Sequence, residues 1–183
     1  QHHVVPTHYH YYTTTTLTDL LVPTYKQNLK NVAAWLNKTN GDEDLLMRRP
    51  APDMFPLATQ VRFVCFQAQE AVHRLMAQEI PAHVLEVAQE GRKFGGGLSS
   101  SSKKDNDDHD DPKDTLEAAN ARIQEALTFL ETLEPHALDQ DGSAQRIMSL
   151  ELQDLGIPFD LTGEQYVRDW ALPQFYFHTM TAY

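Results

Sequence analysis

The spacing of apolar residues along three long stretches constrains the fold of this chain more than any other feature. In residues 17–36, 54–75 and 116–130, apolar side chains recur every three or four positions, which is the period of one face of an α-helix. Each stretch therefore predicts an amphipathic helix that buries one stripe against its neighbours. In the first helix, the predicted core residues are Leu17, Leu21, Tyr25, Leu29, Val32 and Leu36.

The last segment, residues 163–183, predicts a fourth helix with an interruption. Pro173 cannot donate to the helical ladder and clashes with the preceding turn, so we expect a kink or break near residues 171–172. Ahead of this segment, apolar and polar residues alternate in IMSLEL, and IPFDLT follows after a short gap, which is typical of a small β-hairpin. The sequence thus predicts an all-α four-helix bundle, with a long crossover between helices two and three and a hairpin before helix four.

The predicted domain organisation is a single bundle domain with two segments outside its core. Residues 1–13 contain four histidines and a proline without helical spacing, and we expect a disordered leader there. Residues 90–112 combine glycines, a serine run and an acidic run, which is typical of a disordered surface insertion. The rest of residues 14–183 is long enough to bury one core.

Composition and charge exclude several classes of function. The formal net charge is −11, and no basic cluster is present to neutralise phosphates, so we expect no nucleic-acid partner. No apolar run approaches the roughly 20 residues that span a bilayer, and the first residues lack the features of a signal peptide. We therefore expect a cytoplasmic protein without a membrane partner. Cys65 is the only cysteine, which excludes an intramolecular disulfide and a cysteine-based zinc site.

Several residues are candidates for the starts of the helices. Asp53 is the expected N-cap of the second helix, and either Thr162 or Gly163 that of the fourth, because these residue types satisfy free amide groups at a helix start. Asp114 with Glu117 resembles a capping box for the third helix, although Asp111 before Pro112 competes as the cap.

Two motifs resemble a known family. APDMFPLATQV (residues 51–61) and LPQFYFHTMTAY (residues 172–183) resemble signatures of an uncharacterised domain-of-unknown-function family within the DinB-like helical-bundle superfamily. The resemblance covers most of residues 14–183 apart from the acidic insertion. Members of the family continue the final helix past the position of Tyr183, so the resemblance implies that this chain is cut short.

The resemblance also implies a metal site that this sequence does not reproduce. Many DinB-like bundles hold a divalent metal with three histidines, one early in the second helix and two placed four residues apart on the fourth, and some act as metal-dependent hydrolases or thiol-dependent transferases. Here the residues four positions from His178 are Gln174 and Ala182, and the second helix has no histidine until His73. We therefore predict no metal ligand and no cofactor.

The candidate site lies where the second and fourth helices would meet. In an up-down-down-up bundle, the start of helix two and the end of helix four share one end, which would bring Asp53 close to His178. A carboxylate beside an imidazole fixes its tautomer and raises its basicity, as a general base requires. The alternative, which we favour from sequence, is that Asp53 caps its helix and His178 fills core volume. Further candidates for a ligand pocket are Gln60, Trp170, Gln174 and Tyr183.

Three functions remain open from the sequence, which does not decide whether the protein is an enzyme. The first is binding of a small molecule near Asp53 and His178, with or without metal-independent catalysis. The second is a metal-dependent DinB-like enzyme. The third is a non-catalytic dimer, and the superfamily resemblance implies a homodimer. Phe63 and Phe66 fall opposite the core stripe of the second helix and need cover, which we expect from the chain itself rather than from a dimer partner.

Overall fold

The protein, described here from a computed structural model, is mostly helical, with a small two-stranded hairpin. The structure describes residues 15–95, 114–152 and 156–183; the predicted leader and nearly all of the predicted insertion lie outside these ranges. The elements are α1 (Leu17–Asn37), η1 (Glu43–Met47), α2 (Leu57–Leu75), α3 (Ala82–Phe94), α4 (Leu116–Glu131), η2 (Ala137–Asp139), β1 (Ile147–Leu152), β2 (Ile157–Thr162), α5 (Gly163–Gln165), η3 (Tyr166–Ala171) and α6 (Leu172–Thr181).

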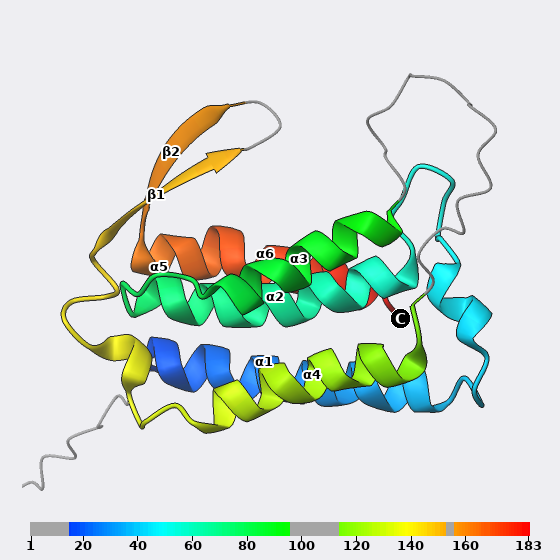
Figure 1. Cartoon of the computed structure of the whole chain (residues 1–183). Helices are drawn as coiled ribbons and strands as arrows, with labels where there is room; N and C mark the ends of the chain where they lie inside the picture. Colours follow the sequence, from blue (N-terminus) through cyan, green and yellow to red (C-terminus); the bar gives the residue numbers. More distant parts are fainter. Residues whose placement is uncertain (1–14, 96–113, 153–155) are drawn as a thin grey trace, which may run out of the picture.

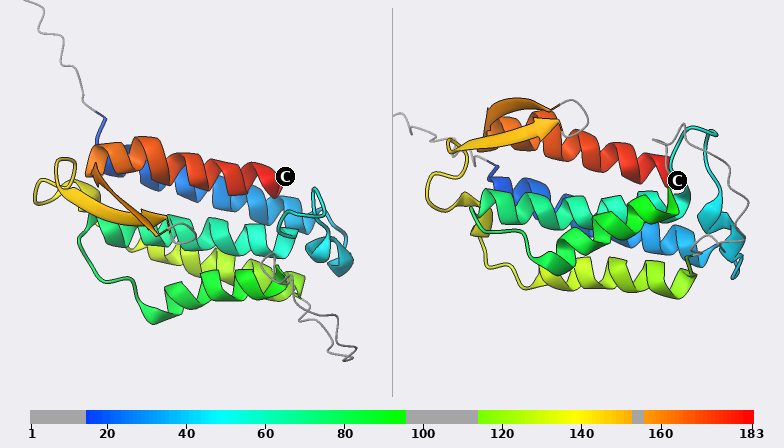
Figure 2. Two further views of the ribbon diagram at one scale, coloured as in Figure 1. Left: turned by 90° about the horizontal axis from the view of Figure 1, so that it is seen from above. Right: turned by 45° about the horizontal axis from the view of Figure 1, so that its top comes forward.

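The long helices lie side by side around one core. Figure 1 shows α1 and α6 running in one direction and α2 and α4 in the opposite one, with α3 laid across the outside of α2. Views from two further directions show the same arrangement (Figure 2). The start of α2 and the end of α6 consequently share one end of the molecule.

The first helix buries the stripe that its periodicity predicts. Its fully buried residues are Leu21, Tyr25, Leu29, Val32 and Leu36, and each apolar side chain of this size contributes roughly 1.5–3 kcal/mol on burial. Leu17 packs against this core from a partly buried position. The helix begins at Leu17, so Pro23 lies inside it. Thr16 caps the first turn by accepting a hydrogen bond from the amide of Asp19 (3.1 Å).

Helix α3 is the main element that the sequence did not predict. It presents a narrow apolar face, and residues 90–94, which we assigned to the insertion, form its last turns. Gly91 lets α3 approach α2 closely, because a Cβ atom there would lie 2.9 Å from the Cβ of Arg62 and 3.3 Å from the ring of Phe63. The hydroxyl of Thr59 donates to the Gly91 carbonyl (2.6 Å). This contact joins α3 to α2 in the crossover.

The hairpin and the interrupted final helix agree with the sequence. β1 and β2 pair antiparallel, and the hairpin stands on the outside of the bundle next to α5 (Figure 1). Thr162 caps α5 in a capping box with Gln165, as one of the two predicted caps. The interruption takes the form of a π-helical segment, η3, after which Pro173 occupies the first turn of α6, where its missing amide hydrogen costs little.

Two predicted caps are wrong. Pro56, and not Asp53, is the N-cap residue of α2, and it makes no side-chain capping bond. Thr115, and not Asp114, caps α4 by accepting from the amide of Ala118 (3.1 Å). Asp114 instead accepts two hydrogen bonds from Arg62. A buried guanidinium is stable only with a carboxylate partner. Asp114 therefore pairs with Arg62 instead of capping the helix.

Candidate functional site

A hydrogen bond joins the two helix ends that the sequence motifs mark. The imidazole Nδ1 of His178, on α6, lies 2.7 Å from Oε1 of Gln60, on α2. Gln60 is 2% exposed because it lies one turn into a helix whose sides are covered by α3 and α6. The contact therefore sits within the bundle, at the end where α2 begins and α6 finishes (Figure 1).

The second bond of Gln60 fixes the tautomer of His178. The Gln60 Nε2 group donates to the carbonyl of Phe55 (3.3 Å), so its oxygen is the atom that faces the ring. An amide oxygen only accepts, and the proton therefore resides on Nδ1 of His178. The second ring nitrogen, Nε2, carries the lone pair, and it has no hydrogen-bond partner within the described ranges. The site thus holds one imidazole nitrogen available to accept a hydrogen bond.

Aromatic rings surround the imidazole and keep it neutral. Phe63 and Phe177 each lie edge-on to the ring of His178, with centroid distances of 5.0 Å. Burial among these groups lowers the pKa of His178 from 6.5 to about 4, since an enclosed apolar surrounding disfavours the charged form. At neutral pH, His178 is an uncharged hydrogen-bond acceptor. Its low pKa makes it a weak general base there, because an efficient base has a pKa near the operating pH.

The other predicted site residues do not all join this pair. Asp53 is exposed, and no hydrogen bond or ion pair among the described residues connects it to His178. Trp170 packs against Phe159 of the hairpin, with ring centroids 5.2 Å apart. It precedes His178 by eight positions, which is about 12 Å along a helix. Gln174 is partly buried one turn before His178. Of the predicted set, the structure brings together Gln60 and His178.

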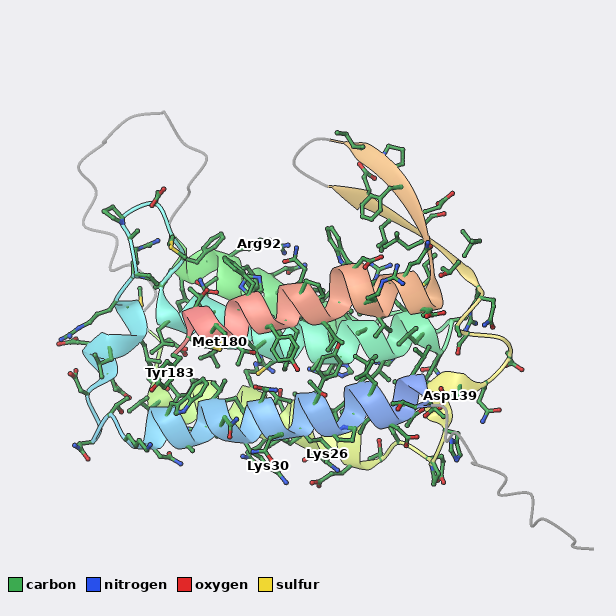
Figure 3. The ribbon with its side chains drawn as sticks, turned by 180° about the vertical axis from the view of Figure 1, so that it is seen from behind. Lys26, Lys30, Arg92, Asp139, Met180 and Tyr183 are labelled. Carbon is green, nitrogen blue, oxygen red and sulfur yellow. The ribbon has the colours of Figure 1, made fainter. Side chains whose placement is uncertain are left out.

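Tyr183 lines a groove beside this pair. The groove has a volume of about 360 Å³ and lies between the end of α1, η1, the start of α2 and the end of α6. Leu57 lines it one turn before Gln60, and Thr181 lines it one turn after His178, whereas Gln60 and His178 themselves are not among its lining residues. Tyr183 stacks edge-on against Trp35, with centroids 4.9 Å apart. Figure 3 shows Tyr183 at this end of the bundle, beyond Met180.

The sequence did not identify the basic residues of this groove. Arg48 and Arg49 line it, and they stand directly before the APDMFPL motif. Their position directly before that motif is the sequence feature that could have identified them as candidate site residues. Two consecutive arginines are common at protein surfaces, and only the groove that several elements form together shows that these two face a common space.

A second cleft, of about 460 Å³, lies among α2, α3 and α4 and is dominated by paired charges. Arg62 donates to both oxygens of Asp114, at 2.8 and 2.7 Å, and both side chains are almost fully buried. Burial raises the pKa of Asp114, although Arg62 opposes this shift. Burial also opposes ionisation of Glu90, but hydrogen bonds and charges from Arg122 and Arg62 outweigh it and lower its pKa. Because Arg62 and Arg122 are both paired with carboxylates of the chain itself, we interpret these ion pairs as contacts that hold the three helices together.

The residues around His178 do not fit the three-histidine metal centre of DinB-like bundles. One turn to either side of His178 stand Gln174 and Ala182, and Gln60 faces it from α2. The Oε1 atom of Gln60 already accepts a hydrogen bond from Nδ1 of His178, so it is not free to bind a metal ion. Within the described ranges, no three histidine, cysteine, aspartate or glutamate side chains gather closely enough to share a metal ion. A single imidazole with one amide is a poor set for a transition metal.

Comparison with known proteins agrees with the fold. Residues 11–183 match the family described as a domain of unknown function, DUF1993. A solved structure described as a DinB family member protein from Shewanella denitrificans is 28% identical, with a TM-score of 0.61, and the match covers 91% of this chain and 82% of that one. No curated protein matches significantly. Among the described residues, no helix is both long and apolar enough to cross a membrane.

Proposed function

Since the chain belongs to the domain-of-unknown-function family DUF1993 and is similar to a DinB family member, we propose that it is an up-down-down-up bundle that binds a small molecule at the end where α2 begins and α6 finishes. In this proposal α1, α2, α4 and the α5–η3–α6 rod form the bundle, and α3 is an addition within the crossover. The bound molecule lies in the groove next to Gln60 and His178.

The orientation of the imidazole is the observation that carries this proposal. Gln60 fixes the proton of His178 on Nδ1, and an enclosed, neutral ring then presents Nε2 as an acceptor. Nε2 is not among the buried side-chain atoms that lack a partner in the described part of the chain, so a molecule from outside can reach it. In this proposal the ligand donates an O–H or N–H group to Nε2. His178 and Gln60 thus recognise the ligand, and Gln60 takes the orienting role that we expected of Asp53.

The low pKa of His178 favours recognition over base catalysis in the free protein. A base with a pKa of about 4 removes a proton from an ordinary hydroxyl with little driving force at neutral pH. The proposal includes metal-independent catalysis only if the bound ligand itself raises the pKa of His178. A bound anionic group close to the ring would stabilise the imidazolium and raise the pKa of His178, which would make it a better base only when the site is filled.

A fragment screen by ligand-observed NMR tests the proposal. The wild type and His178→Phe are screened against the same fragments, and the thermal stability of both proteins is measured first to confirm that the variant is folded. We expect fragments with a donor group to bind the wild type, and at least tenfold loss of affinity in His178→Phe, because phenylalanine keeps a ring but has no acceptor atom. Equal binding of every fragment to both proteins would remove His178 from the site.

A second candidate, assembly into a homodimer, has separate support on α6. One side of this helix exposes four large apolar residues, with exposed fractions between 43% and 82%: Tyr176, Phe177, Met180 and Tyr183. Soluble proteins seldom leave such a contiguous set uncovered. Light scattering across a dilution series tests this candidate, and a monomer at every concentration would reject it. Phe63 and Phe66 no longer support it, since Phe63 packs against Phe55 and His178 and Phe66 against the core.

A further inference from the structure

The charged side chains that line the groove are all basic. Arg48 and Arg49 line it, and none of its lining residues is an aspartate or glutamate. The whole chain, by contrast, carries 26 acidic and 15 basic residues. A groove of positive charge in an acidic protein attracts negatively charged molecules, because walls of low dielectric constant concentrate the field of the arginines.

The two arginines have different surroundings. The guanidinium of Arg49 donates to the carbonyls of Met54 (2.7 Å) and Gly95 (3.0 Å), so its charge is held in place without neutralisation by a carboxylate. Arg48 is exposed, and its guanidinium forms no hydrogen bond or ion pair with another described residue. Arg48 is therefore available for a two-point bond to a carboxylate or phosphate, the groups that match the planar donor array of arginine.

The remaining walls of the groove are apolar and aromatic. Trp35 and Tyr183 form one side, with ring centroids 4.9 Å apart, and Leu36, Leu45 and Leu57 contribute aliphatic surface. Such a surface takes a flat apolar body better than a small hydrated anion, because burial of apolar area adds to affinity. The polar hydroxyls of Thr39 and Thr181 also line the groove.

We propose that the ligand of this groove is an organic anion, in which a carboxylate or phosphate group binds Arg48 and a flat apolar body packs against Trp35 and Tyr183. This inference rests on the proposed function, since it places the ligand in the same groove. The negative group neutralises the field of Arg48 and Arg49, and no acidic side chain of the groove opposes it.

The two tryptophans allow a test within one sample. Trp35 lines the groove, whereas Trp170 packs against the hairpin. The ¹⁵N-labelled protein is titrated separately with benzoate, phenyl phosphate, benzamide and benzylammonium, while the indole N–H signals and the ring protons of His178 are recorded. We expect both anions to shift the Trp35 signal saturably and to leave the Trp170 signal unchanged. Benzamide, which has the shape of benzoate without its charge, is expected to bind about tenfold more weakly.

Variants assign the charge recognition to one residue. Arg48→Gln is expected to weaken benzoate binding about tenfold, Arg48→Lys is expected to retain part of the affinity, and Arg168→Gln is the matched control. Arg168 is exposed and paired with Asp169 near the opposite end of α6. The relative affinities of benzoate and phenyl phosphate show which of the two anionic groups the groove prefers.

The outcomes separate this inference from the function on which it rests. If benzamide or benzylammonium binds as tightly as benzoate, or if Arg48→Gln has no effect, the ligand is not an anion, whereas shifts at His178 still support a ligand site. If none of the four probes moves the signals of Trp35 or His178, neither the anion nor the proposed site survives.

Discussion

Acidification of the protein should reveal the buried, neutral state of His178 as a loss of stability. In the unfolded chain, this histidine binds a proton below about pH 6.5, but in the folded protein burial delays protonation until about pH 4. Between these values the unfolded state binds more protons, so the free energy of unfolding falls as the pH falls. The stabilising contribution is fully present above pH 6.5 and is lost towards pH 4.

The size of the effect follows from the shift in pKa. One pKa unit corresponds to about 1.4 kcal/mol, so a shift from 6.5 to about 4 gives a loss of about 3 kcal/mol between neutral pH and pH 4. This figure is a large fraction of the 5–15 kcal/mol that is typical of a folded domain. Other groups also titrate in this range, so the contribution of His178 has to be measured as a difference between two proteins.

Urea denaturation of the wild type and of His178→Gln isolates this difference. Glutamine does not titrate, so the gap in unfolding free energy between the two proteins should shrink by about 3 kcal/mol as the pH falls from 7 to 4. His83→Gln, which makes the same substitution at an exposed histidine in the first turn of α3, is the matched control. Parallel curves for the wild type and His178→Gln would refute the reasoning, because they would show that His178 protonates equally in the folded and unfolded states.

Three further substitutions test other parts of the structure. Gln60→Glu should raise the pKa of His178, because a carboxylate beside the ring stabilises the imidazolium; an NMR titration that shows an unchanged or lower pKa would contradict the assigned hydrogen bond. Asp114→Ala should cost about 3–5 kcal/mol in urea denaturation, because it leaves the buried guanidinium of Arg62 unpaired, whereas Arg62→Met with Asp114→Leu should recover much of the loss. Gly163→Ala should lower the melting temperature by the equivalent of about 1–3 kcal/mol, because a Cβ there would lie 1.9 Å from a backbone oxygen of the preceding loop; an unchanged melting temperature would show that the loop is free to move.

The long-range architecture was predictable where one physical signal dominated. The stripe on α1 was correct because a helix of 21 residues repeats its apolar period several times. The hairpin was correct because its alternation of apolar and polar residues has a period that a helix cannot share. The interruption near Pro173 was anticipated, but the π-helical form of η3 was not, since a missing amide hydrogen does not specify how the chain relieves the clash.

Errors arose where tertiary contacts outweighed local preference. Helix α3 was missed even though its buried residues Val84, Val87, Ala88 and Gly91 recur at helical spacing, because its last residues were assigned to the glycine-rich insertion. The carboxylate of Asp114 could cap a helix, but it accepts two hydrogen bonds from the buried guanidinium of Arg62 instead. This ion pair joins residues more than 50 positions apart in the sequence, so no local pattern predicts it.

The candidate site was predictable in part. The two motifs lie at the start of α2 and the end of α6, where Gln60 and His178 form a contact, and the function of this site stays a prediction. Asp53 was expected as the partner because a carboxylate is the usual companion of a catalytic imidazole, but it lies ahead of the helix and remains exposed. The role of Arg48 and Arg49 depends on a groove formed by several elements, which no local pattern in the sequence encodes.

The position of the proton on the ring of His178 tests the central claim most directly. Long-range ¹H–¹⁵N correlation spectra of the histidine rings at neutral pH distinguish protonated from unprotonated nitrogens, and a spectrum of His178→Gln identifies the signals of this residue. The account predicts that Nδ1 carries the proton, in its bond to Gln60, and that Nε2 carries none. A proton on Nε2, or on both nitrogens, would contradict the account.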